Sequence, residues 1–169
     1  IFENLRLNIE DTMKALVFKA HTFPTAATAP LVQKVVNHLA KERGIKPVRV
    51  FGGITLNNYV GGLNPKAVKM CIRLGGKIVE LPSHDAAHHH KVMGEPGGIE
   101  VLTKENELVP QLREILHLIA ENNLILGTGH CGTREKFKII KEATKIGVDK
   151  ILVTHPDWNV TKMSIEQMM

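Results

Sequence analysis

Histidine dominates the residues of this sequence that could do chemistry, since the chain has nine of them. Seven follow within a few residues of the end of a predicted strand, and these are His21, His84, His88, His89, His90, His130 and His155. Only His38 and His117 fall inside predicted helices. The carboxyl ends of parallel strands meet at one edge of a sheet, where ligand sites are found. We therefore expect most of the histidines to gather at one site.

A divalent metal ion is the first chemistry that these histidines suggest, because neutral imidazole is the commonest metal ligand. We predict His130, His155 and His89 as the ligands. The ion would lower the pKa of water from 15.7 to about 7 and so make it a nucleophile at neutral pH. Zinc is the expected metal, and manganese, iron or nickel are alternatives.

Other polar residues near the same strand ends are candidates for proton transfer and substrate contact. We predict Asp85 and Asp157 as catalytic residues and Lys19, His21 and Asn57 as substrate-binding residues. Asp85 could act as a general base or could instead orient a metal ligand. Lys19 could simply extend its amine to the rim, or it could hold an anionic substrate or, if carboxylated, bridge two metals.

Adjacent histidines and a neighbouring thiol have simpler explanations than catalysis. In an extended loop, His88, His89 and His90 point in different directions, so at most two of them could reach one ion, and a solvated or partner-binding loop is the alternative. Cys131 follows His130 but has no evident base, so we expect a small buried thiol.

Five repeats of an apolar run, a polar loop and a helix-like segment position these residues. The predicted strands are 15–19, 48–51, 77–81, 124–126 and 150–154. The predicted helices start near Thr28, Pro65, Pro110 and Thr133, and a fifth begins near the chain end. We also expect a histidine-rich loop up to His90 and a hairpin over 99–109 that turns at residues 105–106. No linker separates the repeats, so we predict one domain over 1–169.

The periodicity predicts an α/β fold with parallel strands buried on both faces. It leaves a (β/α)₈ barrel of the TIM type and an open doubly wound sheet both possible. The absence of a G-x-G-x-x-G or phosphate-loop motif lowers the nucleotide-binding version of the open sheet. A barrel needs roughly 250 residues, so we expect this chain to be a partial barrel from a longer polypeptide.

Composition excludes several classes of protein. The net charge of +5 comes from scattered lysines and arginines, and with one Tyr and one Trp it does not predict nucleic-acid binding. No apolar run approaches the roughly 20 residues that cross a bilayer, so no membrane contact is expected. Two cysteines without CxxC spacing favour a reducing cytoplasm. We expect a small-molecule substrate and allow for a homo-oligomer.

Five motifs together resemble an uncharacterised family of amidohydrolase-like proteins, a domain of unknown function within the metal-dependent hydrolases. They are VFGGITLN (50–57), VGGLNP (60–65), LPSHDAAHH (81–89), GTGH (127–130) and VTHP (153–156), and the likeness covers about residue 14 to the end. The resemblance implies a (β/α)₈ barrel with a metal, often zinc, at the strand ends.

The resemblance also places individual residues. His130 and His155 match the single histidines after the fifth and sixth strands, so the five predicted strands correspond to strands 2 to 6 of a barrel. The His-x-His pair of the first strand and the aspartate of the eighth have no counterpart here. At the fourth strand, where a metal-bridging lysine is common, this sequence has Asp85 and His89, which argues against a binuclear centre.

The leading expectation is metal-dependent hydrolysis of an amide, ester or phosphoester bond in a small molecule. A metal-dependent decarboxylase or other lyase of the same superfamily is the enzyme alternative. A non-catalytic binding protein on a degenerate barrel is the alternative outside enzymes, and the residues that precede Ile1 in the full-length protein would favour it if they lack the His-x-His pair.

Overall fold

The fold is a mixed α/β arrangement in which parallel strands alternate with helices. A computed structural model describes residues 13–169 and contains the strands β1 (Ala15–Val17), β2 (Arg49–Phe51), β3 (Gly53–Thr55), β4 (Ile78–Glu80), β5 (Ile125–Gly127) and β6 (Ile151–Leu152). All pairings are parallel, and the strand order β1-β2 and β3-β4-β5-β6 follows the chain. Residues 1–12 of the predicted single domain lie outside the described part.

Strands β2 and β3 are separated by a single residue, Gly52, which links the two sheets. The predicted strand over 48–51 is confirmed as β2, but the sequence did not predict β3, in which the chain resumes pairing at Gly53. A Cβ atom at Gly52 would lie 2.4 Å from the carbonyl oxygen of Thr25, so only glycine lets this loop pack against the strand. Thr25 then hydrogen-bonds to Gly53 through its hydroxyl, at 2.9 Å from the backbone nitrogen.

The long helices form where the sequence predicted them, because their ends carry local signals. They are α2 (Ala29–Glu42), α3 (Pro65–Arg73), α5 (Pro110–Glu121) and α6 (Thr133–Ile146). Asn64 caps α3 by accepting hydrogen bonds from the backbone of Lys66 and Ala67. Gly147 ends α6 in the left-handed conformation.

Two predictions in the middle of the chain need correction. The histidine-rich loop is a short helix, α4 (Ala87–Met93), and the predicted loop there is wrong. The hairpin over 99–109 forms only its turn, with one isolated bridge between Leu102 and Leu108. Two 3-10 helices, η1 (Thr25–Ala27) and η2 (Asn58–Val60), and a terminal α7 (Ile165–Met168) complete the elements.

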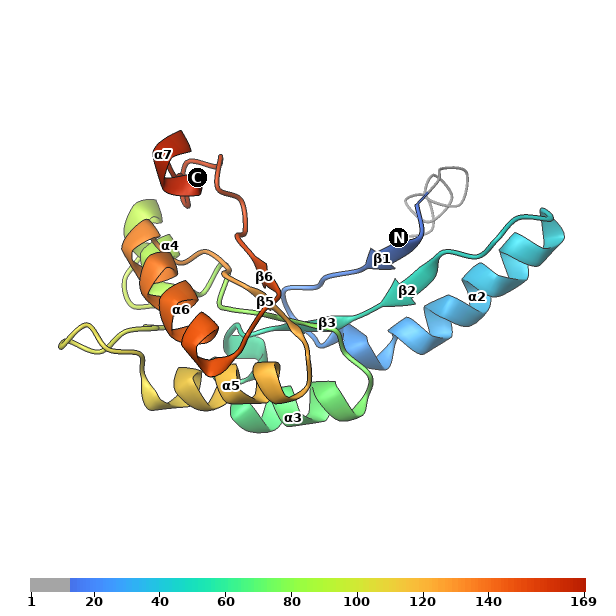
Figure 1. Ribbon diagram of the computed structural model, residues 1–169, viewed down its shortest axis with the longest axis horizontal. Helices are drawn as coiled ribbons and strands as arrows, with labels where there is room; N and C mark the ends of the chain where they lie inside the picture. Colours follow the sequence, from blue (N-terminus) through green and yellow to red (C-terminus); the bar gives the residue numbers. More distant parts are fainter. Residues whose placement is uncertain (1–12) are drawn as a thin grey trace.

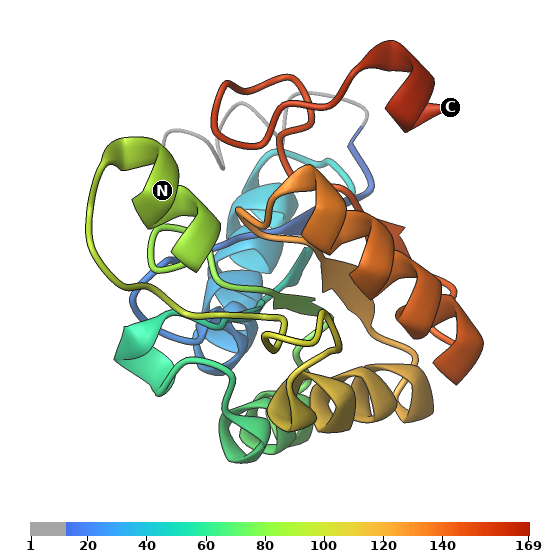
Figure 2. The ribbon, with the colours of Figure 1, turned by 90° about the vertical axis from the view of Figure 1, so that its left-hand side faces the viewer.

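The helices pack along one side of the strands. Figure 1 shows α2, α3 and α5 below the strands, and in Figure 2 α3, α5 and α6 follow one another around them. The main core lies between these layers and includes Ile54, Val79 and Leu126 from the strands with Leu112 and Leu116 from α5. None of the helices among the described residues combines the length and apolar character that a bilayer crossing needs.

The opposite side of the strands carries the residues that alternate with this core. Ile78, Ile125 and Leu152 line an open cavity of about 490 Å³, together with Lys19 and Glu80 near its end. Because side chains alternate along a strand, the same β4 residues that flank buried Val79 point into this cavity. Within residues 13–169 the strand order contains no reversal of the kind that defines a doubly wound sheet.

Candidate functional site

The loops that leave the carboxyl ends of β1, β4, β5 and β6 bring histidines together. An open cavity of about 380 Å³ is lined by His21, His84, His130, His155 and Trp158. The rings of His21 and His84 are 4.5 Å apart and those of His84 and His130 are 5.2 Å apart. The expectation that the strand-end histidines converge is therefore met for His21, His84, His130 and His155.

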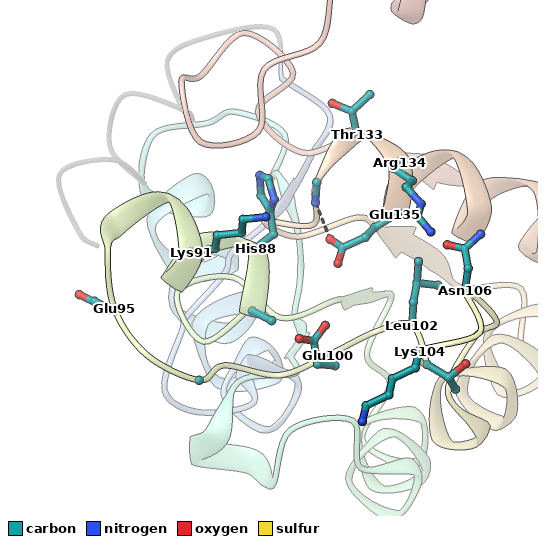
Figure 3. Close-up of a pocket in the computed structure, with 14 residues that line it drawn as sticks. His88, Lys91, Glu95, Glu100, Leu102, Lys104, Asn106, Thr133, Arg134 and Glu135 are labelled. Carbon is teal, nitrogen blue, oxygen red and sulfur yellow. Dashed lines mark hydrogen bonds between the residues drawn. The ribbon is translucent and has the colours of Figure 1, made fainter.

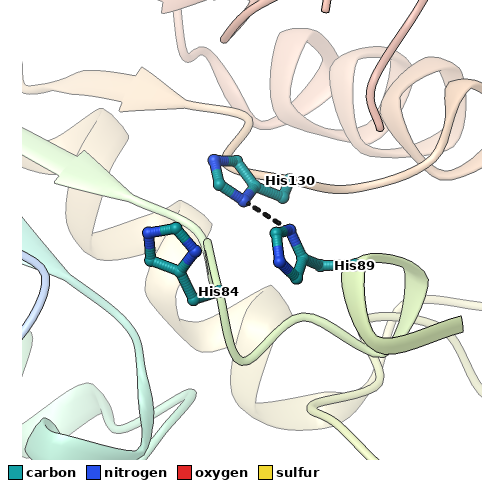
Figure 4. Close-up of side chains that lie close together, drawn as sticks. All are labelled: His84, His89 and His130. Carbon is teal, nitrogen blue, oxygen red and sulfur yellow. Dashed lines mark hydrogen bonds between the residues drawn. The ribbon is translucent and has the colours of Figure 1, made fainter. Parts of the chain in front are cut away.

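Three histidines form the tightest group among the described residues. Ring nitrogens of His84, His89 and His130 all lie within 4.8 Å of one another. Figure 4 shows the three rings turned toward one another, His84 and His130 from strand-end loops and His89 from α4. Nδ1 of His130 and Nδ1 of His89 are hydrogen-bonded at 3.0 Å, so one of the two nitrogens carries the proton. This group could hold a metal ion.

His130 is fixed by the backbone around it and is almost completely buried, at 2% exposure. Gly129 adopts the left-handed conformation, and the backbone nitrogen of His130 donates to the carbonyl of Pro82 at 2.9 Å. Burial, followed by the neighbouring His89 and His84, lowers the pKa of His130 to about 3. The imidazole is therefore neutral at physiological pH and keeps a lone pair for a cation.

His89 shares this environment, whereas its two neighbours in the chain do not. Burial and then His84 lower the pKa of His89. His88 contacts the carbonyl of Val160 through Nε2 at 2.7 Å, and His90 contacts the carbonyl of Pro96 through Nδ1 at 2.9 Å. One histidine of the run reaches the group of three, because the helical turn sends each side chain in a different direction.

His155, which the sequence predicted as a ligand, lies beside the group of three and outside it. Its ring centroid is 5.7 Å from that of His130 and 5.9 Å from that of Trp158. Its backbone is left-handed, with φ 47°, and its carbonyl accepts a hydrogen bond from the hydroxyl of Thr161. A non-glycine residue in this region is uncommon and is often found at functional sites. The structure brings in His84 as the third member.

Of the residues predicted to bind substrate, His21 lines this cavity, Lys19 lines the neighbouring one, and Asn57 lies behind His21. His21 contacts the hydroxyl of Ser83 through Nδ1 at 2.8 Å, and burial, followed by Lys19, lowers the pKa of His21. Asn57 is buried and uses its amide on Ser83 and on the carbonyl of His21, at 2.9 and 3.1 Å. Asn57 therefore supports the loops that carry His21 and His84.

The two aspartates predicted as catalytic are not part of the histidine group. Asp85 accepts a hydrogen bond from the backbone nitrogen of Asn58 at 2.7 Å, which anchors the loop after β3. Asp157 is exposed in the loop after β6. Neither carboxylate is among the three residues whose ligand atoms cluster within residues 13–169.

Sequence reasoning missed one buried carboxylate, that of Glu80 at the end of β4. Glu80 is 3% exposed, its Oε2 accepts from the Thr154 hydroxyl at 3.2 Å, and the same oxygen lies 3.7 Å from Nζ of Lys19. The signal was present, since Glu80 is a charged residue within the apolar run 78–81. Trp158 was also missed, and its signal is that it is the single tryptophan of the chain.

A larger cavity of about 700 Å³ lies away from the strand ends, between α4, the 97–106 loop and the start of α6. Figure 3 shows its lining, in which acidic and basic side chains such as Lys91, Glu100 and Glu135 alternate. Glu135 already accepts the backbone N-H of Gly132 at 2.6 Å. The histidine cavity is the better candidate because its groups converge on one point.

The whole chain, residues 1–169, matches a family of unknown function (DUF6282). A search among curated proteins found no match.

Proposed function

Since the chain belongs to the DUF6282 family, whose function is unknown, we propose from its own site that the protein is a metal-dependent hydrolase acting on a small molecule. The observation that carries the proposal is the convergence of His84, His89 and His130 at the carboxyl edge of a parallel sheet. A decarboxylase or other lyase would use the same site, and product analysis separates it from a hydrolase.

The three histidines fit a divalent ion. Ligand nitrogens around tetrahedral zinc are about 3.3 Å apart, given bonds of about 2.0 Å. The ring nitrogens of His84, His89 and His130 span distances from 3.0 Å up to 4.8 Å, so small rotations would bring all three to one ion. Burial lowers the pKa of both His89 and His130, which keeps them neutral and able to bind it. When bound, zinc would polarise a substrate carbonyl and make water nucleophilic near neutral pH.

Residues of the chain supply the rest of the site. His155 faces His130 across the cavity and is placed to exchange a proton with a bound substrate. His21 and Lys19 lie beside it and contact the substrate. Trp158 forms one wall of the cavity. The aspartates Asp85 and Asp157 have no assigned step.

We also propose that the strands β1 to β6 belong to a (β/α)₈ barrel. Parallel sheets are found with both faces covered, and here the helices pack on one face while the other holds an open cavity. The sequential strand order is that of a barrel, in which every strand neighbours the preceding one. Further strands of a longer polypeptide would close the cavity.

Elemental analysis tests the metal site directly. We expect the protein, purified without an affinity tag or chelator and incubated with zinc, to hold about one ion per chain. His89→Ala and His130→Ala should weaken zinc binding by more than about 100-fold, since even changes beyond the ligands cost up to this much. His90→Ala is the matched control because its side chain points to Pro96.

Equal zinc content in all four proteins would contradict the assignment of His89 and His130. If none of the proteins binds metal after incubation with zinc or with manganese, the hydrolase proposal fails and a binding protein is favoured. Zinc-loaded protein that releases carbon dioxide from a substrate instead of hydrolysing it would favour the lyase.

A further inference from the structure

Lys19 holds a positive charge beside the histidine cavity without a hydrogen-bond acceptor. Its side chain is 28% exposed, and its closest charged partner is Oε2 of Glu80 at 3.7 Å. That distance is beyond hydrogen-bond length. Within residues 13–169 no side chain or carbonyl accepts from the three N-H groups of this ammonium, so they are available to a bound molecule.

The position of Lys19 is fixed by the sheet. Glu80 is held by the Thr154 hydroxyl at 3.2 Å and in turn holds the ammonium. Gly127 of β5 makes room for this carboxylate, because a Cβ atom there would lie 2.4 Å from Oε2 of Glu80. Three neighbouring parts of the structure therefore combine to place one lysine.

Lys19 lies close to the histidines. Burial is the main reason that the pKa values of His21 and His130 are lowered, and the charge of Lys19 contributes to both. Lys19 and His155 line one cavity, and His155 also lines the cavity of the three histidines. A molecule bound beside His155 can reach the ammonium.

With a divalent ion bound, the site would carry a net positive charge that an anionic ligand would offset. Histidine binds a metal ion as the uncharged imidazole, and the histidine cavity is lined by no carboxylate among the described residues. Glu80 offsets only the charge of Lys19. A divalent ion would leave two positive charges in a partly buried site, where unbalanced charge is costly.

We infer that the ligand of this site is a small carboxylate monoanion with a flat apolar group, bound by Lys19 through its carboxylate and by Trp158 through its flat group. The inference rests on the proposed function. A carboxylate suits one lysine, whereas phosphoryl groups are usually met by arginine or several donors, and no arginine lines either cavity. The Trp158 ring lies 5.0 Å from that of His130 and offers the flat surface.

Benzoate is the probe, with benzamide as its neutral counterpart and phenylphosphonate as the dianion. Quenching of Trp158, the single tryptophan, reports binding to the zinc-loaded protein. We expect benzoate to bind at least about tenfold more tightly than either alternative, because charge-assisted hydrogen bonds are the stronger ones. Lys19→Met should weaken benzoate binding by about tenfold with zinc content unchanged, while Lys14→Met, an exposed lysine before the same strand, should leave both unchanged.

Each of the other outcomes contradicts a specific part of the inference or of the proposed function. Equal affinity for benzoate and benzamide, or unchanged benzoate binding by Lys19→Met, overturns the carboxylate inference. Tighter binding of phenylphosphonate overturns the monoanion class. Zinc bound without any benzoate binding overturns the inference alone, whereas loss of zinc from the wild-type protein is the failure of the proposed function.

Discussion

Gly129 ties the position of His130 to the end of β4, and its replacement by alanine is a sharp test of the site. Gly129 has a left-handed backbone with φ +58°, and a Cβ atom there would lie 2.4 Å from the carbonyl oxygens of both Leu81 and Pro82. These are backbone atoms, which cannot rotate away as a side chain could. The Pro82 carbonyl also accepts the N-H of His130.

The expected cost has two parts that a control separates. A left-handed backbone costs an alanine about 1 kcal/mol relative to glycine. Gly44 has a similar φ of +66° and nothing within 4 Å of its Cβ position, so Gly44→Ala should show only this cost. Gly129→Ala adds an overpacked contact of about 2 kcal/mol. We expect a loss of about 3 kcal/mol in the free energy of unfolding for Gly129→Ala against about 1 kcal/mol for Gly44→Ala.

Urea unfolding followed by circular dichroism measures both losses, and calorimetry measures zinc binding by the two variants. Gly129→Ala should bind zinc more weakly than Gly44→Ala, because relief of the contact moves His130 away from His89. The reasoning is refuted if Gly129→Ala loses no more stability than Gly44→Ala, since the backbone of Leu81 would then be free to yield.

Two further predictions concern titration and the aspartate after β4. Burial is the main reason that the pKa of His130 is lowered to about 3. Below about pH 6.5 this histidine is therefore protonated in the unfolded chain and stays neutral in the folded protein. Metal-free protein should therefore lose about 2 kcal/mol of stability from this group between pH 7 and pH 5, and His130→Gln should flatten that dependence in urea titrations; an unchanged slope would show a different cause. Asp85→Asn should keep full zinc content in elemental analysis, because the carboxylate serves the backbone of Asn58; loss of zinc would return Asp85 to the metal site.

The elements that sequence predicted best are those whose ends have local chemistry. Pro110 and Thr133 begin helices and Gly147 ends one, as expected from the restricted φ of proline and the freedom of glycine. The parallel strands followed from their apolar runs. The choice between a doubly wound sheet and sequential pairing could not follow from periodicity, because strand order depends on which helix packs on which face.

The helix α4 was missed because its own sequence gives little reason for it. Ala86 at its N-cap makes no side-chain cap, and histidine is a weak helix former. A helix of seven residues is too short to be stable by itself. Its first turn is held from outside, where the backbone of Ala87 bonds to Ile99 at 3.0 Å, a contact distant in sequence.

The same limit explains which site residues were predicted. The proximity of His130 and His89 could be predicted because the strand edge gathers the loops, and this depends only on the βα pattern. The sequence predicted His155 as the third member of the group, whereas the structure has His84 there. Which of the two joins the group depends on the exact course of two loops. His155 leaves β6 in a left-handed conformation, which turns its ring toward Trp158, and no sequence signal marks that turn.

The charge arrangement of the site belongs to the sheet, whereas its histidines belong to loops and to α4. Glu80 and Gly127 are strand residues that lie side by side in the register of β4 and β5. Lys19 follows β1 by two residues, and Glu80 fixes it from across the cavity. A larger residue at Gly127 would displace Glu80 and with it Lys19, so the proposed preference for an anion depends on these strand residues. The position of His89 in the group of three histidines depends instead on α4, a helix that is stabilised by contacts distant in sequence.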